Sequence, residues 1–168
     1  MLLREPTRAD WPRLLELNQA SVNELSALDE ARLELVLSLA HRNLVVESDG
    51  EVVGFAIAMA PGVPYDSDNY RWFSKSFQEF LYLDRVAVAE SMRRRGIGAQ
   101  LYDAMESAAQ PFGRMVCEVN VVPRNDASLA FHASRGYREI GHFEHSPQKA
   151  VALMSKELFA LARDVDGQ

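Results

Sequence analysis

Apolar positions in the first part of the chain follow the spacing of helices. Leucines and other apolar residues recur every three or four positions over residues 10–26 and again over 29–41, which predicts two consecutive helices. Asp10 precedes the first helix as an N-cap, and Pro12 fits its first turn. A short strand over residues 2–5 comes before both helices, so the chain is expected to open as strand, helix, helix.

The next apolar runs are shorter and predict strands. Residues 43–59 contain two such runs around Asp49-Gly50, a dipeptide typical of a β-hairpin turn, and Gly54 in the second run indicates a bulge. A further strand is expected over residues 80–88. Residues 60–80 fit neither spacing and are rich in aromatic residues, which argues against disorder, so we expect a functional loop there.

Helices and strands alternate in the second half of the chain. Helices are predicted over 96–110 and 126–135, and strands over 114–122, 136–143 and 150–156. The whole order is β-α-α-β-β-β-α-β-α-β-β, an α/β class with a mixed, mostly antiparallel sheet flanked by helices. Strict alternation fails in the first half, which excludes a doubly wound sheet. The 168 residues fit a single domain, 1–168.

Composition narrows the class of protein. The chain is 48% hydrophobic and 25% charged, as in soluble globular proteins, and it has no apolar run long enough to span a membrane. Its N-terminal residues lack the features of a secretory signal. The single cysteine, Cys117, cannot form an internal disulfide, so we expect a cytoplasmic protein that is not bound to membranes.

A local basic cluster stands out against the overall charge. The net charge is −6, which argues against a nucleic-acid partner. Fifteen arginines accompany only three lysines, and three of the arginines are consecutive, Arg93–Arg95. A triplet of this kind is often only a solvated loop, but in an acidic chain it also indicates a site for an anion.

The residues after the basic cluster favour the anion site. An apolar strand ends at Val88, and Gly96 and Gly98 then open an amphipathic helix. A helix N-terminus leaves backbone N–H groups unpaired, and glycines let an anion approach them closely. The segment therefore predicts a phosphate or pyrophosphate cradle. A P-loop would require a lysine, and a Rossmann loop would require glycine or alanine at Leu101, so neither of these motifs is present.

Two motifs resemble those of the GNAT acetyltransferase superfamily. Arg93-x-x-Gly96-x-Gly98 after an apolar strand resembles its acetyl-CoA motif. About thirty residues downstream, the family often shows Asn-x-x-Ala-x-x-x-Tyr-x-x-x-Gly-Phe, and this chain keeps that spacing with Asn125, Ser128, His132, Gly136 and Tyr137. The predicted element order resembles the GNAT fold over residues 1–158.

The resemblance implies a coenzyme site. Acetyl-CoA is the expected co-substrate, with its pyrophosphate on the loop amides and its pantetheine arm along a strand that separates from its neighbour. Asn125 is expected to contact the pantetheine or to cap the following helix. No metal is expected, because the histidines lack metal-ligand spacing. The predicted coenzyme-binding residues are Val86, Ala87, Val88, Arg93, Arg94, Arg95, Gly96, Ile97, Gly98, Ala99, Asn125 and Ser128.

The expected activity is direct acetyl transfer to a primary amine in a ternary complex. His132 replaces the tyrosine that the family uses as an acid, and its imidazolium form could protonate the leaving thiolate. The alternatives are that His132 is only a helix residue and that water supplies this proton. Asp84 and Glu118 are the candidate bases, although Asp84 fits an ion pair with a nearby arginine equally well.

The acceptor is expected beside residues 65–73. Tyr70, Trp72 and Phe73 could close over an amine, and Asp66 could attract it. The same residues fit an apolar patch packed on the sheet or on a second subunit of a homodimer equally well. We expect a small-molecule amine as the acceptor; the alternatives are a protein N-terminus or lysine, or a non-catalytic acyl-CoA-binding module on the same fold.

Overall fold

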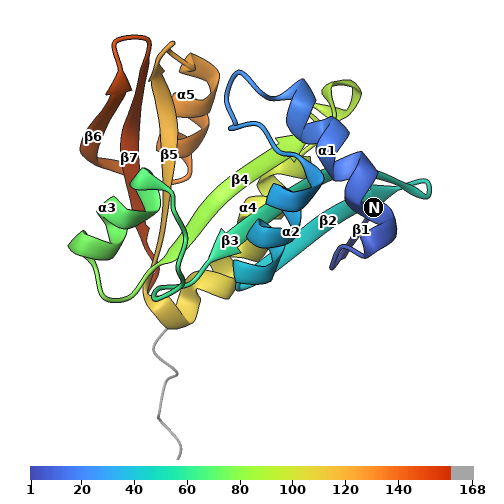
Figure 1. Ribbon diagram of the computed structural model, residues 1–168, viewed down its shortest axis with the longest axis horizontal. Helices are drawn as coiled ribbons and strands as arrows, with labels where there is room; N and C mark the ends of the chain where they lie inside the picture. The colour runs from blue at the N-terminus through green and yellow to red at the C-terminus, as the bar shows by residue number, and fades with distance from the viewer. Residues whose placement is uncertain (160–168) are drawn as a thin grey trace, which may run out of the picture.

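A seven-stranded sheet organises the computed structural model, which describes residues 1–159 (Figure 1). The strand order is β1-β2-β3-β4-β5-β7-β6, and every neighbouring pair is antiparallel except β4 and β5. The sheet confirms the mixed α/β class. Its strands are β1 (Leu2–Arg4), β2 (Arg42–Ser48), β3 (Glu51–Met59), β4 (Leu81–Val88), β5 (Arg114–Val122), β6 (Arg138–Ser146) and β7 (Lys149–Glu157).

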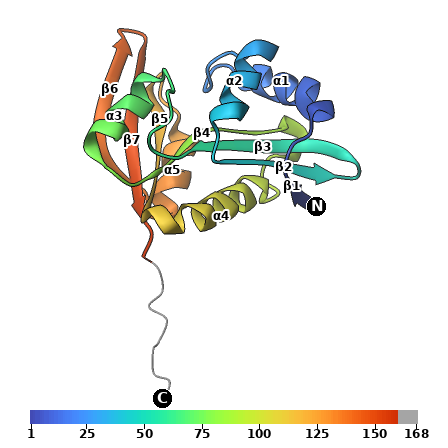
Figure 2. The ribbon, with the colours of Figure 1, turned by 60° about the horizontal axis from the view of Figure 1, so that its bottom comes forward.

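Helices cover both faces of the sheet. Figure 2 shows α1 and α2 on one face of the β2–β4 region and α4 on the other. β3 therefore lies between two helical layers, and all of its residues except Glu51 are buried. This double burial explains the nearly continuous apolar run in its sequence. The helices are α1 (Trp11–Ala20), α2 (Glu30–Leu39), α3 (Asp68–Ser76), α4 (Ile97–Ala109) and α5 (Asp126–Ser134).

The predicted bulge at Gly54 is present in the β2–β3 hairpin. Val46 pairs with Gly54 but Glu47 pairs with Val52, so β3 carries one extra residue. A Cβ atom on Gly54 would lie 3.1 Å from a methyl group of Ile97 in α4. The glycine thus lets α4 approach β3 closely, which fixes the start of that helix against the sheet.

The segment predicted as a loop over residues 60–80 contains helix α3, and here the sequence prediction was wrong. Ser67 caps the helix by accepting a hydrogen bond from the Tyr70 backbone N–H at 3.2 Å. Tyr70 and Phe73 follow at helical spacing and are buried. The helix has only nine residues, and the residues before its cap, Pro61, Gly62 and Pro64, are typical of loops. The sequence pattern therefore did not indicate a helix here.

Strands β4 and β5 separate soon after they meet. Their parallel pairing covers only Leu81 with Met115 and Tyr82 with Val116. β4 continues to Val88 with β3 as its only partner among the described strands. Beyond Tyr82 the second edge of β4 is therefore open, and a cleft forms between the two strands.

We predict that Gly141 of β6 is required for packing of α3. A Cβ atom there would lie 2.6 Å and 2.9 Å from two carbons of the Trp72 indole. Gly141→Ala is expected to lower the free energy of unfolding by about 1–3 kcal/mol, because either the ring or the strand must move. Urea denaturation measures the change.

Two further variants make this test specific. Trp72→Leu removes the clashing ring, so adding Gly141→Ala in that background is expected to cost much less. Gly98→Ala is the control, because a Cβ atom on Gly98 meets nothing within 4 Å. Equal costs of Gly141→Ala with and without Trp72 would contradict the prediction.

Candidate active site

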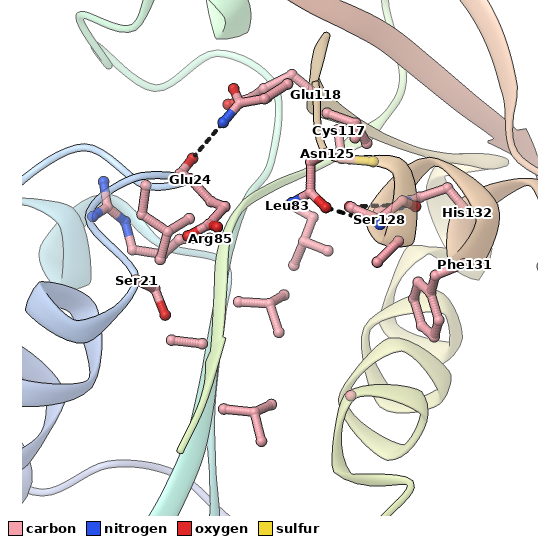
Figure 3. A pocket seen from close by; sticks show the side chains of 18 of the residues that line it. Ser21, Glu24, Leu83, Arg85, Cys117, Glu118, Asn125, Ser128, Phe131 and His132 are labelled. Atoms are coloured by element: carbon pink, nitrogen blue, oxygen red, sulfur yellow. Dashed lines mark hydrogen bonds between the residues drawn. The ribbon is translucent and has the colours of Figure 1, made fainter. Parts of the chain in front are cut away.

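The cleft between β4 and β5 holds a cavity of about 440 Å³. Leu83–Val88 of β4 form one wall, and Cys117–Asn120 of β5 form the other. Figure 3 shows this cavity between the segment that joins α1 to α2, toward which Arg85 points, and α5, which carries Phe131 and His132. The open edge of β4 supplies unpaired backbone N–H and C=O groups on this side, as the pantetheine interpretation requires.

The basic loop leads to one end of this cavity. Gly96 adopts the left-handed conformation, with φ of 79°, and caps α4 without a side-chain hydrogen bond. The first N–H groups of α4 are therefore left for another acceptor. Arg93, Arg94 and Arg95 are exposed, and among residues 1–159 none of them forms an ion pair.

Some of the residues predicted to bind the coenzyme line the cavity, and others do not. Val86, Ala87, Val88, Arg93 and Gly98 line it, as do Asn125 and Ser128. Ile97 is instead a core residue of α4 with 1% exposure. Arg94, Arg95, Gly96 and Ala99 belong to the loop and the helix start and do not line the cavity wall.

Asn125 caps helix α5, which is one of the two roles expected for it. Its side-chain oxygen caps α5 by accepting a hydrogen bond from the Ser128 backbone N–H at 3.1 Å. It also lines the cavity, so the cap orients its amide group beside the cleft. Asn125 and Ser128 of the second motif thus lie at the start of α5, beside this cavity.

Glu118 lies where this cavity meets a second one. The second cavity, of about 430 Å³, also has Asp84, Arg85 and Glu118 in its wall. The Tyr82 hydroxyl donates to both carboxylate oxygens of Glu118 at 2.8 Å. Burial raises the pKa of Glu118 to about 7, with a contribution from the negative charge of Asp84. A carboxyl group with this pKa can take up and release protons at neutral pH.

Comparisons with known proteins agree with this geometry. The model of the acetyltransferase (GNAT) family matches residues 9–137. This chain belongs to the GNAT acetyltransferase family. A search among curated proteins gives no match.

Solved structures of several GNAT acetyltransferases share the fold. A ribosomal-protein-alanine N-acetyltransferase from Brucella melitensis is 27% identical over 94% of this chain and 100% of its own, with a TM-score of 0.71. A phosphinothricin acetyltransferase from Sinorhizobium meliloti in complex with AcCoA is 21% identical over 94% and 88%, with a TM-score of 0.69. Ard1 from Thermoplasma volcanium is 20% identical over 95% and 98%, with a TM-score of 0.76.

Asp84, the other candidate base of this GNAT domain, is engaged on both oxygens. The Arg85 Nε donates to one at 2.7 Å, and the Tyr65 hydroxyl donates to the other at 2.6 Å. The side chain is only 5% exposed. The structure therefore contains the ion pair that the sequence left as the alternative, whereas Glu118 forms no ion pair within residues 1–159.

The predicted acceptor wall differs from the expectation. Tyr70 and Phe73 are buried in the core, where the Tyr70 hydroxyl donates to the Ala60 carbonyl at 2.7 Å. Trp72 packs on Gly141 of β6. None of the three lines the cavity around Glu118, because α3 turns their rings toward the sheet. Asp66 does line it, paired with Arg32, whose guanidinium lowers the pKa of this carboxyl.

His132 is buried, and both of its ring nitrogens have partners. Nδ1 lies 2.7 Å from the Ser128 carbonyl oxygen, which can only accept, so Nδ1 carries a proton. Nε2 lies 2.6 Å from the Tyr102 hydroxyl, which donates to it when the ring is neutral. Burial lowers the pKa of His132, which favours the neutral ring and weighs against an imidazolium acid at neutral pH.

Sequence reasoning missed several residues that line the two cavities. Tyr102 of α4 is one of them. It was missed because it follows Leu101 in an amphipathic helix, where a tyrosine is expected to face the core. Phe131 lies within the second motif, next to His132, at a position that the motif leaves open. Further lining residues come from segments without a motif, among them Glu24, Leu25, Asn69, Asn120, His145 and Lys149.

Three further observations concern the single cysteine, metal-ligating side chains and the length of the helices. Cys117 is buried, and burial raises the pKa of its thiol well above the usual value, which suits a core residue. No cluster of metal-ligating side chains occurs within residues 1–159. Over the same range no helix is both long and apolar enough to cross a membrane.

We predict that His132 is neutral at pH 7.5, with its proton on Nδ1. Burial disfavours the charged ring, and the Ser128 carbonyl fixes the tautomer. Long-range nitrogen–proton NMR correlation of the ring assigns both features, and His142 serves as an internal reference because its side chain is exposed. A charged His132 ring at this pH, or a proton on Nε2 alone, would contradict the prediction.

Proposed function

We propose that this GNAT domain transfers an acetyl group from acetyl-CoA to a primary amine by direct attack in a ternary complex. The observation that carries the proposal is the position of Glu118 in the wall shared by the two cavities. One cavity adjoins the basic loop and takes the coenzyme, and the other takes the amine. A base at their junction touches the place where the two substrates must meet.

The residues around the first cavity fit acetyl-CoA. The uncapped start of α4 with Gly98, next to three exposed arginines, suits the pyrophosphate. The open edge of β4 over residues 86–88 suits the amide groups of pantetheine. Asn125 and Ser128 lie across the cleft from that edge. The coenzyme supplies a thioester whose carbonyl carbon accepts the amine.

Glu118 prepares the acceptor in this proposal. Its carboxylate accepts a proton from the incoming ammonium group, and the neutral amine can then form the new C–N bond as the C–S bond breaks. Tyr82 holds the carboxylate in place by bonding both oxygens. The attacking nitrogen loses its second proton to water, and water returns a proton to the leaving sulfur, because His132 is held neutral and its Nε2 is already occupied by Tyr102.

The nature of the amine is a separate part of the proposal. We expected a small molecule behind a wall of residues 65–73. Tyr65, Asp66, Ser67 and Asn69 of this segment do line the cavity, but the rings of Tyr70, Trp72 and Phe73 do not. The α-amine of a polypeptide is therefore a second candidate acceptor. It is also supported by the ribosomal-protein-alanine N-acetyltransferase that is 27% identical to this chain.

Three further properties remain predictions. They are a single acetyltransferase domain over residues 1–168, the last nine of which lie outside the described residues, a cytoplasmic location, and a possible homodimer. Gel filtration and light scattering of the full chain would measure the oligomeric state.

Glu118→Gln is predicted to lower kcat by about 10²-fold or more while leaving acetyl-CoA binding intact. In the unaltered protein, kcat/KM is expected to rise with pH through about 7, because Glu118 must lose its proton to act as the base. Thiol release from acetyl-CoA, measured over a panel of amines and peptides at several pH values, gives both quantities.

Asp84→Asn separates the two candidate bases. Asp84 raises the pKa of Glu118, so removing its charge is expected to move the acidic limb of the profile to lower pH. The kcat should fall far less than in Glu118→Gln, while the KM for the acceptor rises because Asp84 also pairs with the buried Arg85. Loss of activity in Asp84→Asn together with full activity in Glu118→Gln would reverse the assignment.

Gly98→Leu is predicted to weaken acetyl-CoA binding by at least about tenfold. The position is open in this structure, so the leucine fits the folded protein but occupies space beside the free N–H groups of α4. Acetyl-CoA should raise Tm of the unaltered protein and much less that of the variant. Ser107→Leu, at an exposed position of the same helix, is the control and should bind normally.

A further inference from the structure

Arg85 is a buried cation in the wall of both cavities. Its residue exposure is 3%, and its Nε donates to Asp84, the preceding residue in β4. Neighbouring residues in a regular strand point to opposite faces. These two lie on the same side because β4 is bulged here, with Ile57 paired to Arg85 but Ala58 paired to Leu83. The bulge makes Asp84 the extra residue and allows the pair to form.

The remaining hydrogen bonds of Arg85 go to one neighbouring region. Nη1 donates to the side-chain oxygen of Asn18 at 2.9 Å and to the Ser26 carbonyl at 3.2 Å, and Nη2 donates to the Ser26 hydroxyl at 3.0 Å. Asn18 is fully buried near the end of α1, and its amide also donates to the Ser26 carbonyl at 3.0 Å. Residues 21–29, which we call the α1–α2 segment, are thus held through Ser26.

The α1–α2 segment spans the opening between the separated strands. Glu24 and Leu25 line both cavities, and Ser26 lines the acceptor cavity. On the β5 side, the amide of Asn120 approaches the carbonyl oxygens of Asn23 and Glu24 at 3.4 Å and 3.5 Å. These contacts are longer than those of Arg85, so β4 provides the firmer attachment.

We propose that Asp84 and Arg85 are positioning residues that hold the α1–α2 segment as the acceptor-side wall of the site. The inference rests on the proposed function, which assigns the second cavity to the amine. Arg85 acts through Ser26 and Asn18 and touches no reacting atom. Asp84 balances the buried charge of Arg85, and the Tyr65 hydroxyl satisfies its second oxygen.

The chemistry requires arginine in particular. A planar guanidinium can bond Asp84 with Nε while its two other nitrogens bond Asn18 and Ser26 in fixed directions. A lysine would keep the charge opposite Asp84 but could not make the same set of bonds. Arg85→Lys therefore tests the geometry without leaving a buried carboxylate unpaired.

The experiment compares two variants of the full chain with a control. Ser26→Ala removes one acceptor of Arg85 and changes little else, so it stays informative if Arg85→Lys fails to fold. Ser38→Ala is the control, because this exposed serine on α2 bonds only its own helix, at the Leu35 carbonyl. Hydrogen–deuterium exchange of the backbone amides is measured first, and steady-state kinetics follow with the best acceptor found.

Exchange over residues 21–29 is expected to become about tenfold faster in both variants and to stay unchanged in Ser38→Ala. The KM for the acceptor should rise about tenfold, with kcat and the Kd for acetyl-CoA within about threefold of the original values. A merely structural defect would instead lower Tm and both kinetic parameters together.

Two results would overturn the inference. One is unchanged exchange over residues 21–29 in folded Arg85→Lys and Ser26→Ala. The other is faster exchange with an unaltered KM for the acceptor, which would show that the segment does not contribute to acceptor binding. If the chain transfers no acetyl group to any amine, the proposed function fails, and the exchange data alone still decide whether Arg85 holds the segment.

Discussion

The early separation of β4 from β5 is the constraint on which the rest of the site depends. Two parallel strands that stay paired would bury their polar edges against each other and leave no room between them. Here the pairing ends after Tyr82 and Val116, so the following backbone groups of β4 must find other partners. A substrate with its own amide groups can provide them. The helices on both faces keep the sheet together while its centre is open.

The separation of the two strands also places Asp84 and Glu118 in the cavity walls, where their hydrogen-bond partners differ. Asp84 lies beside Arg85, and its two oxygens accept hydrogen bonds from the Arg85 guanidinium and the Tyr65 hydroxyl. Glu118 accepts hydrogen bonds from the Tyr82 hydroxyl and forms no ion pair within residues 1–159, and burial raises its pKa to about 7. The two carboxyl groups lie on neighbouring strands but have different surroundings, which suits the different roles that we propose for them. Spacing along the chain cannot distinguish them, because the partners come from distant segments.

Sequence patterns predicted most of the fold because its elements are long and regular. The buried run of β3, the Asp49-Gly50 turn and the glycines at the start of α4 each have a local cause that is visible in the chain. Helix α3 was not predicted because it has only nine residues and begins shortly after Pro61, Gly62 and Pro64, which are typical of turns. Its aromatic rings pack into the core, where burial of apolar area outweighs any contact they could make with an amine.

The site was predictable only where it depends on backbone motifs. The proposed coenzyme side depends on one loop and one helix cap, so the positions of Gly98 and Asn125 beside the cavity could be predicted from spacing alone. The acceptor side is assembled from the α1–α2 segment, the region before α3, two strands and the β6–β7 hairpin. Its walls are joined by a buried arginine whose partners are 59 and 67 residues away in the chain. Because such long-range bonds define that cavity, a substitution at Ser26 can change acceptor binding as directly as one at the base.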